Sequence, residues 1–301
     1  MPLIFKDIKT TLGSEKINNK FLEKKYKWKK NKIFNKTGIK SRFRSNKNQT
    51  VETLAISALM KLKKKNNLDK VSFLVFVSNT APLGFPSMAH QLSSKIIDNE
   101  NIFSFSINSG CTGFVDALIL ISNLLNKDNK QAIIVTSDTY TKYLDSNDKG
   151  TNSIFSDGAS ATLLEYSSNG YSIVKKIISQ KKSSCKSLQM KNNKIFMNGP
   201  EVLLFSINDV IPNLKKLIKN NTLVLIHQAG KIIIDNIKMH IKKNYIMPTN
   251  FSKYGNLIST SIPKLIEDNF SVLKKNNNIL ISSFGVGLSQ SHILLNKNYK
   301  K

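Results

Sequence analysis

The chain alternates short, continuous apolar runs with longer amphipathic stretches, and this alternation restricts its fold more than any other feature. The runs are five to seven residues long, and most are rich in β-branched or aromatic residues, as expected for strands buried on both faces. Such strands need helices on both sides, so the pattern predicts a layered α/β fold. The predicted strands span residues 71–77, 102–107, 132–137, 222–226 and 278–283.

Amphipathic helices are predicted between these strands. The clearest begins at Thr50, a residue type that caps helix N-termini, and its apolar residues recur at the spacing of one helix face. Helices and strands therefore follow one another along the whole chain, which argues against an all-α or all-β fold. The predicted helices span residues 50–64, 112–125, 200–218, 229–241 and 257–270.

The length of 301 residues suits one large domain or two closely packed halves. A helix, a strand and a polar loop follow one another at residues 51–77, and the same order recurs at residues 200–226. We therefore expect two similar halves, residues 1–165 and 166–301. Their join is expected in the segment 166–194, which is polar and rich in Ser, Lys and Asn.

Several classes of protein are excluded by composition. The only cysteines are Cys111 and Cys185, and there is no CxxC motif or Cys/His cluster, so neither a disulfide framework nor a metal site is predicted. Cys185 has no flanking chemistry and is interpreted as incidental. No apolar run reaches the roughly 18 to 20 residues that cross a bilayer, and the N-terminal residues lack a signal-peptide core. We therefore expect a cytoplasmic protein that does not associate with membranes.

The formal net charge of +27 raises the hypothesis of a nucleic-acid-binding protein. All but two of the 46 basic residues are lysine, and lysines occur in every segment. No RNP-type aromatic pattern, zinc finger or arginine cluster accompanies them. Lys, Asn and Ile share A/T-rich codons, so codon composition acting on a solvated surface is the simpler explanation. We do not expect a nucleic-acid partner.

Cys111 is the first candidate for chemistry. It follows a predicted strand and a turn at Gly110, and it directly precedes a predicted helix. The positive end of that helix dipole favours the thiolate form, which is a strong nucleophile. The structural alternative is a small buried cysteine that fills a strand–helix corner.

Three further features have a similar context. His227 follows predicted strand 222–226, at the end where α/β sheets place their ligands. Asn256 stands in a Gly-Asn pair before a predicted helix, and Gly285-Val286-Gly287 follows the last predicted strand. Alone, each has an ordinary interpretation, as a hydrogen-bonded histidine, a helix cap and a turn.

Taken together and in this order, these features resemble the β-ketoacyl-ACP synthase III family of thiolase-fold condensing enzymes. The resemblance covers nearly the whole chain. Its most specific parts are the Cys111 motif, residues 155–161 (FSDGASA, similar to the family's FGDGAGA) and residues 197–202 (MNGPEV, similar to MNGxEV). Weaker matches are KTGI at residues 36–39, FPS at 85–87, SD at 137–138 and DKGT at 148–151.

The resemblance implies a thiolase-like layered αβαβα fold from two pseudo-repeated halves. It implies acyl transfer from an acyl thioester to Cys111, then decarboxylative Claisen condensation with malonyl-ACP to give 3-oxoacyl-ACP. His227 and Asn256 would bind the malonyl thioester carbonyl, where fixed N–H donors stabilise enolate charge. The backbone N–H groups of Cys111 and Val286 would form the oxyanion hole for the acyl carbonyl.

The resemblance also implies the rest of the site. Phe85 and Phe284 would line the acyl pocket, with Phe85 reaching across the interface of a homodimer. Entry of coenzyme A, or of the pantetheine arm of acyl carrier protein, would be flanked by Lys36, Lys149 and Lys231. No permanently bound cofactor is expected, because acyl-CoA or acyl-ACP and malonyl-ACP are substrates.

The chain departs from the family at this entrance. Lys32 stands where many members carry a tryptophan, the only tryptophan being Trp28, and Ile232 stands where an arginine is common. Lys36 and Lys149 replace arginines and lack the flat guanidinium that stacks on adenine. These changes weaken the expected grip on coenzyme A and leave both acyl-CoA and acyl-ACP open as the acyl donor.

A second hypothesis keeps the fold and changes the reaction. Some relatives of this family transfer an acyl group to an amine or hydroxyl without condensation. The complete set of Cys111, His227 and Asn256 favours condensation, because plain acyl transfer does not need an asparagine to stabilise an enolate.

Overall fold

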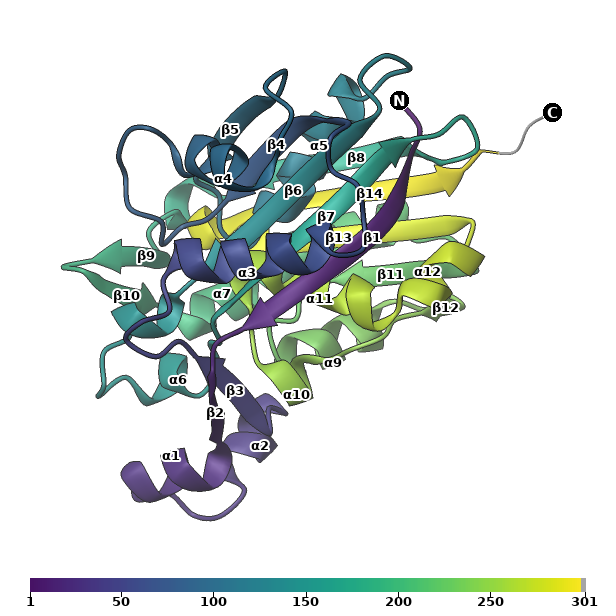
Figure 1. Ribbon diagram of the computed structural model, residues 1–301. Helices are drawn as coiled ribbons and strands as arrows, with labels where there is room; N and C mark the ends of the chain where they lie inside the picture. Colours follow the sequence, from purple (N-terminus) through teal and green to yellow (C-terminus); the bar gives the residue numbers. More distant parts are fainter. Residues whose placement is uncertain (299–301) are drawn as a thin grey trace.

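The computed structural model describes residues 1–298 and contains a ten-stranded mixed sheet in the order β12-β11-β13-β14-β8-β1-β7-β6-β4-β5 (Figure 1). The sheet has two five-stranded halves, which meet where Leu3 of β1 pairs with Tyr171 of β8. The strands of the first half are β1 (Leu3–Leu12), β4 (Val71–Val77), β5 (Phe103–Ile107), β6 (Gln131–Asp138) and β7 (Gly158–Tyr166). Those of the second are β8 (Tyr171–Gln180), β11 (Thr222–Ile226), β12 (Tyr245–Ile246), β13 (Asn278–Gly285) and β14 (Ser289–Lys297).

The two halves have the same strand pattern. In the first, β4 is parallel to both β5 and β6, and β7 is antiparallel to β6 and β1. In the second, β11 is parallel to β12 and β13, and β14 is antiparallel to β13 and β8. The helix–strand order that recurs in the sequence therefore corresponds to a repeated topology.

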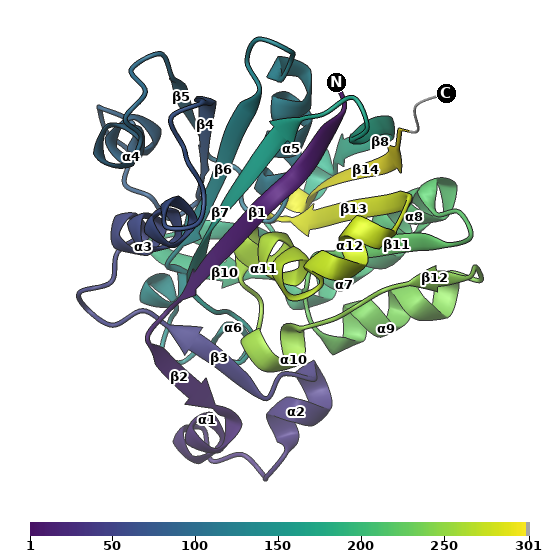
Figure 2. The ribbon, with the colours of Figure 1, turned by 45° about the vertical axis from the view of Figure 1, so that its right-hand side comes forward.

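Helices divide the molecule into five layers. Helices α5 (Gly113–Leu124) and α11 (Ser261–Asp268) lie between the sheet halves, because their apolar residues pack in one core with strands of both halves. The outer face of the first half is covered by α3 (Val51–Lys63) and α4 (Met88–Ile96), and that of the second by α7 (Gly199–Phe205), α8 (Ile211–Leu217) and α9 (Lys231–His240). Figure 2 shows these outer helices on opposite sides of α11. The predicted layered αβαβα fold is confirmed.

The continuous apolar runs became the parallel strands of the two sheet halves, and β4 and β11 match their predicted ranges residue for residue. The predicted helix 200–218 is divided by a π-helical turn, Ser206–Val210, which separates α7 from α8. The connection between the two halves, residues 167–170, lies inside the predicted join 166–194, but most of that segment is structured and begins with β8. β8 is exposed along most of its length and carries Lys175 and Lys176 in its middle, so its sequence lacks the apolar continuity of a strand covered on both faces.

Smaller elements surround one end of the sheet. In Figure 1, β2 (Glu15–Asn18), β3 (Ser41–Arg44), α1 (Asn19–Lys25) and α2 (Lys32–Thr37) project below it. A hairpin of β9 (Leu188–Lys191) and β10 (Lys194–Met197) projects to one side. The remaining short helices are α6 (Lys149–Asn152), α10 (Phe251–Tyr254) and α12 (Phe270–Lys275). None of the helices within residues 1–298 is long and apolar enough to cross a membrane.

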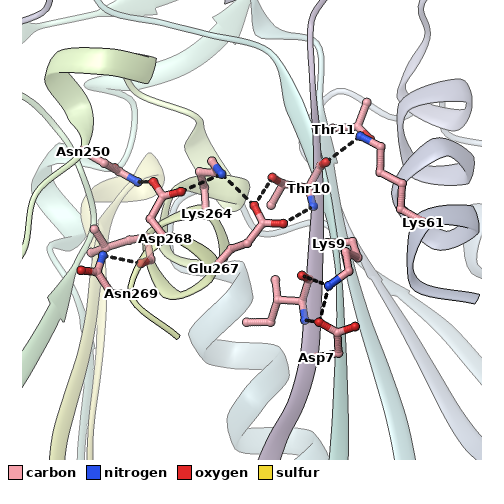
Figure 3. Close-up of polar contacts among 12 residues, drawn as sticks. Asp7, Lys9, Thr10, Thr11, Lys61, Asn250, Lys264, Glu267, Asp268 and Asn269 are labelled. Atoms are coloured by element: carbon pink, nitrogen blue, oxygen red, sulfur yellow. Dashed lines mark hydrogen bonds and ion pairs between the residues drawn. The ribbon is translucent and has the colours of Figure 1, made fainter. Parts of the chain in front are cut away.

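A charged cluster joins the middle helix layer to the sheet (Figure 3). The ammonium group of Lys264 on α11 lies 2.7 Å from a carboxylate oxygen of Glu267 and 2.8 Å from one of Asp268. Glu267 in turn accepts hydrogen bonds from the backbone N–H and the hydroxyl of Thr10 on β1. Burial lowers the pKa of Lys264, but the hydrogen bonds to Asp268 and Glu267 outweigh that effect and hold its pKa above the ordinary value.

Candidate active site

Cys111 lies between the end of β5 and the start of α5, and its side chain is almost fully buried. The loop after β13 passes directly over it. A Cβ atom built on Gly285 would lie 2.5 Å from the Cys111 Sγ, which is far closer than carbon and sulfur can approach. Only glycine at position 285 therefore allows the loop to reach the thiol.

Burial raises the pKa of Cys111 to about 12. A backbone N–H hydrogen bond from Val286 opposes this rise, the charge of Asp138 adds to it, and the N–H of Cys111 itself also opposes it. The thiol is thus neutral at neutral pH, which corrects the expectation that the α5 dipole would favour a thiolate: desolvation outweighs the dipole. The two N–H groups that lower the pKa of this thiol, from Cys111 and Val286, are the two predicted for the oxyanion hole.

His227 follows β11, and its backbone N–H donates to the carbonyl of Ser282 at 2.9 Å. The imidazole is buried, and its ring centroid lies 5.8 Å from that of Phe284 in an edge-on arrangement. Burial lowers the pKa of His227 to about 4, so the ring is neutral at neutral pH. Its Nδ1 atom is buried and has no hydrogen-bond partner among residues 1–298.

Asn256 follows the short helix α10 and Gly255. Its backbone N–H donates to the carbonyl of Ile154 at 2.9 Å, and its carbonyl accepts from the N–H of Ser156 at 2.9 Å. The side-chain Oδ1 accepts from the N–H of Ile258 at 2.9 Å. This bond fixes the amide plane, and the NH2 group has no partner in the described part of the chain, so it remains free to donate.

The three side chains line one pocket of about 650 Å³. Cys111 comes from the first half of the chain, and His227 and Asn256 come from the second. Most of the remaining wall is apolar, including Phe284, which was predicted for the acyl pocket. Phe85 is not among the described residues of this wall; it is 98% exposed on the surface.

Exposed lysines line the open part of the pocket. Lys36, Lys149 and Lys231 all contribute to it, as does Ile232. Trp28 also lines the pocket, although it stands four positions before Lys32, where many family members carry their tryptophan. The ammonium groups of Lys32 and Lys149 lie 4.9 and 5.8 Å from its ring centroid. The only signal for Trp28 in the sequence was a single tryptophan within a lysine-rich segment.

A buried carboxylate holds the neighbouring loops together and was not singled out in the sequence as a separate functional residue. Asp138 at the end of β6 accepts hydrogen bonds from Ser78, from the N–H of Asn79, from Thr80 and from Ser259. Ser259 follows Asn256 by three residues, so Asp138 connects the loop after β4 to the segment that follows Asn256. Among residues 1–298, no group of three or more His, Cys, Asp or Glu side chains could hold a metal ion.

Family models and similar proteins of known name all point to one family. Residues 105–181 match the family model described as 3-oxoacyl-[acyl-carrier-protein] synthase III, and residues 213–297 match the model of its C-terminal part. Together the two matches cover more than half of the chain. The chain is 28% identical to a β-ketoacyl-[acyl-carrier-protein] synthase III of Streptococcus agalactiae, over 87% of this chain and 89% of the relative. It is 29% identical to the protein of the same name from Enterococcus faecalis, with the same coverage.

Solved structures share the fold. A crystal structure of a 3-oxoacyl-(acyl-carrier-protein) synthase III superposes with a TM-score of 0.90, at 24% identity, and covers 98% of this chain and 100% of that one. The synthase III of Thermus thermophilus gives a TM-score of 0.86 at 21% identity, covering 98% of this chain and 99% of that one.

Proposed function

The chain belongs to the 3-oxoacyl-[acyl-carrier-protein] synthase III family, and we propose that it is a condensing enzyme that uses Cys111 as its nucleophile. The reaction is acyl transfer from an acyl thioester to Cys111, followed by decarboxylative condensation with malonyl-ACP. The observation that carries this proposal is the meeting of Cys111, His227 and Asn256, from opposite halves of the chain, in one largely apolar pocket.

In the first half-reaction, the Cys111 sulfur attacks the carbonyl carbon of the acyl thioester. A bond forms between sulfur and acyl carbon, the donor thiolate leaves, and the thiol proton of Cys111 is transferred to that thiolate. Because the thiol is neutral at rest, its proton must be removed as attack proceeds, and His227, which lines the same pocket and is neutral, is the proposed acceptor. The N–H groups of Cys111 and Val286 stabilise the oxyanion, and losing one such donor typically costs about 3 to 4 kcal/mol.

In the second half-reaction, the malonyl carboxylate leaves as carbon dioxide, and its bonding electrons form an enolate on the thioester. His227 and the free NH2 group of Asn256 donate to the enolate oxygen. The enolate carbon then attacks the acyl carbonyl, and Cys111 leaves as a thiolate that takes a proton from solvent. The pocket suits this step because an uncharged Asn256 does not repel the enolate, whereas a carboxylate would.

The lysines at the open part of the pocket are proposed to bind the donor. Lys36, Lys149 and Lys231 would hold the phosphate of the pantetheine arm, and Trp28 offers an apolar surface beside them. Two lysines already lie over the Trp28 ring, which leaves less of it for an adenine and favours acyl-ACP over acyl-CoA. We propose acyl-CoA or acyl-ACP and malonyl-ACP as substrates, with no resident cofactor.

We further propose a cytoplasmic homodimer in which Phe85 enters the acyl pocket of the partner. Phe85 and Leu83 are 98% and 92% exposed, which is unusual for large apolar side chains and fits a surface that a second subunit covers.

The role of Cys111 as nucleophile is tested by following the acyl group. Wild-type protein incubated with radiolabelled acyl-ACP should carry the label on the Cys111 peptide, and Cys111→Ala should carry none. Cys185→Ala is the matched control, since Cys185 is exposed and does not line the pocket, and it should be labelled normally at Cys111. Persistent labelling of Cys111→Ala would disprove the nucleophile assignment. Release of carbon dioxide from malonyl-ACP separates condensation from plain acyl transfer to an amine or hydroxyl.

A further inference from the structure

Gln228 directly follows His227, and its buried side chain uses both of its polar atoms. The Oε1 atom accepts two hydrogen bonds, from the backbone N–H of Asn250 at 2.8 Å and from that of Phe251 at 3.2 Å. The Nε2 atom donates to the carbonyl of Ile226 at 2.8 Å. Thus one side chain ties the end of β11, which carries His227, to the start of α10.

Helix α10 transmits this connection to Asn256. The N–H of Gly255 donates to the Phe251 carbonyl at 2.8 Å, so the residue before Asn256 is tied to the same residue that Gln228 holds. The backbone N–H of Gln228 also donates to the hydroxyl of Ser261 at 2.9 Å, in the segment that follows Asn256. Gln228 therefore contacts the chain both before and after Asn256.

We propose that Gln228 is a positioning residue that sets the distance between His227 and Asn256. The inference rests on the proposed function, in which these two side chains donate to the same enolate oxygen. A shared acceptor demands that both donors keep a fixed separation, and a buried amide that accepts from the N–H groups of Asn250 and Phe251 provides it. Gln228 does not line the pocket, so it acts through its neighbours and not on the substrate.

The proposal predicts that the two half-reactions respond differently. Gln228→Met keeps the length and volume of the side chain and removes all three side-chain hydrogen bonds. Carbon dioxide release from malonyl-ACP should fall by about 10-fold or more, whereas formation of acyl-Cys111 should change by less than about 3-fold. In an Asn256→Ala background, the same substitution should cause little further loss of carbon dioxide release, because the donor that it positions is already absent.

Gln290→Met is the matched control. Gln290 is equally buried, on β14, and its amide bonds Ser179 and His292 away from the pocket. It should lower the melting temperature without separating the two half-reactions. If Gln228→Met yields no folded protein, Gln228→Asn decides the same question, because its shorter side chain withdraws the amide from Asn250 and Phe251.

Equal losses in both half-reactions, or a full additional loss in the Asn256→Ala background, would overturn the role of Gln228. If the wild-type protein forms acyl-Cys111 but releases no carbon dioxide, the proposed condensation fails instead, and the positioning role falls with it. Wild-type condensation together with unchanged Gln228→Met activity would overturn the positioning role alone.

Discussion

The backbone N–H of Val286 hydrogen-bonds the sulfur of Cys111, although 175 positions separate them in the sequence. Val286 follows β13 in the second half of the chain, and Cys111 follows β5 in the first. The bond shows that the nucleophile and one of its proposed oxyanion donors are brought together by the packing of the two halves. The donor is ready before substrate arrives, so it needs no reorganisation during the reaction.

The close approach of Gly285 to Cys111 gives the first prediction. In Gly285→Ala, the new Cβ would lie 2.5 Å from the sulfur, so the loop or the cysteine must move. We expect acyl-Cys111 formation to fall by about 100-fold, since a displacement of about 1 Å is enough for such a loss. Single-turnover acylation measures this, with a thermal melt to verify folding. Acylation at the wild-type rate would show that the Val286 donor position is not needed.

Reactivity of Cys111 should increase with pH well above neutrality. Because burial raises the pKa of the thiol to about 12, the thiolate fraction is very small at pH 7 and rises continuously up to pH 10. The rate of alkylation by iodoacetamide, followed by mass measurement of the Cys111 peptide, should therefore show no plateau below pH 10. A plateau near pH 7 would indicate an ion pair with a protonated His227 and would contradict a neutral pair.

His227 should make the fold sensitive to acid. Its pKa is lowered to about 4 in the folded chain, against 6.5 in the unfolded chain, so the unfolded chain binds the proton first as pH falls. This contribution to stability is complete above pH 6.5 and is lost as pH falls through 4, amounting to about 3 kcal/mol at most. His227→Gln should reduce the change in unfolding free energy between pH 7 and pH 4.5, measured by urea titration. An unchanged difference would mean that His227 is already protonated in the folded chain.

Lys264 should contribute to stability far more than an ordinary surface lysine. Its side chain is 12% exposed and bonds both Glu267 and Asp268 (Figure 3), so Lys264→Ala leaves two carboxylates without their cation. We expect a loss of about 1 to 3 kcal/mol in the free energy of unfolding. Lys95→Ala, which removes a half-exposed ion pair with Glu52, is the control and should cost less than about 1 kcal/mol. Equal effects of the two substitutions would contradict this difference.

The lysines beside the pocket should matter for the carrier protein. The segment 20–36 holds eight exposed lysines, and its one acidic residue, Glu23, is buried. Replacing Lys36, Lys149 and Lys231, which line the pocket, by Gln should raise the KM for malonyl-ACP and flatten its dependence on salt. The same replacement at Lys64, Lys65 and Lys70, which do not line the pocket, should leave activity intact. A broad loss from this distant set, in folded protein, would contradict the view that most of the charge reflects codon composition.

The sequence by itself determined the layered fold and the chemical identity of the candidate site. Continuous apolar runs are a direct consequence of burial on both faces, which is why β4 and β11 could be predicted to the residue. It also placed Cys111, His227 and Asn256 at the ends of buried elements, where a fold of this class exposes them. The antiparallel strand β8 was not predicted, because a largely exposed strand with two lysines in its middle resembles a polar loop.

Only the tertiary structure determined the protonation states of the site residues and which residues surround them. Desolvation depends on everything that packs around a group, so only the folded chain revealed a neutral Cys111 beside a neutral His227. Trp28 lines the pocket because the chain from Trp28 to the end of α2 lies beside it. The number of residues between Trp28 and the family's tryptophan position does not predict this placement. The bonds from Gln228 to Asn250 and Phe251 likewise join residues more than 20 positions apart, and such contacts exist only once the second half of the chain has folded.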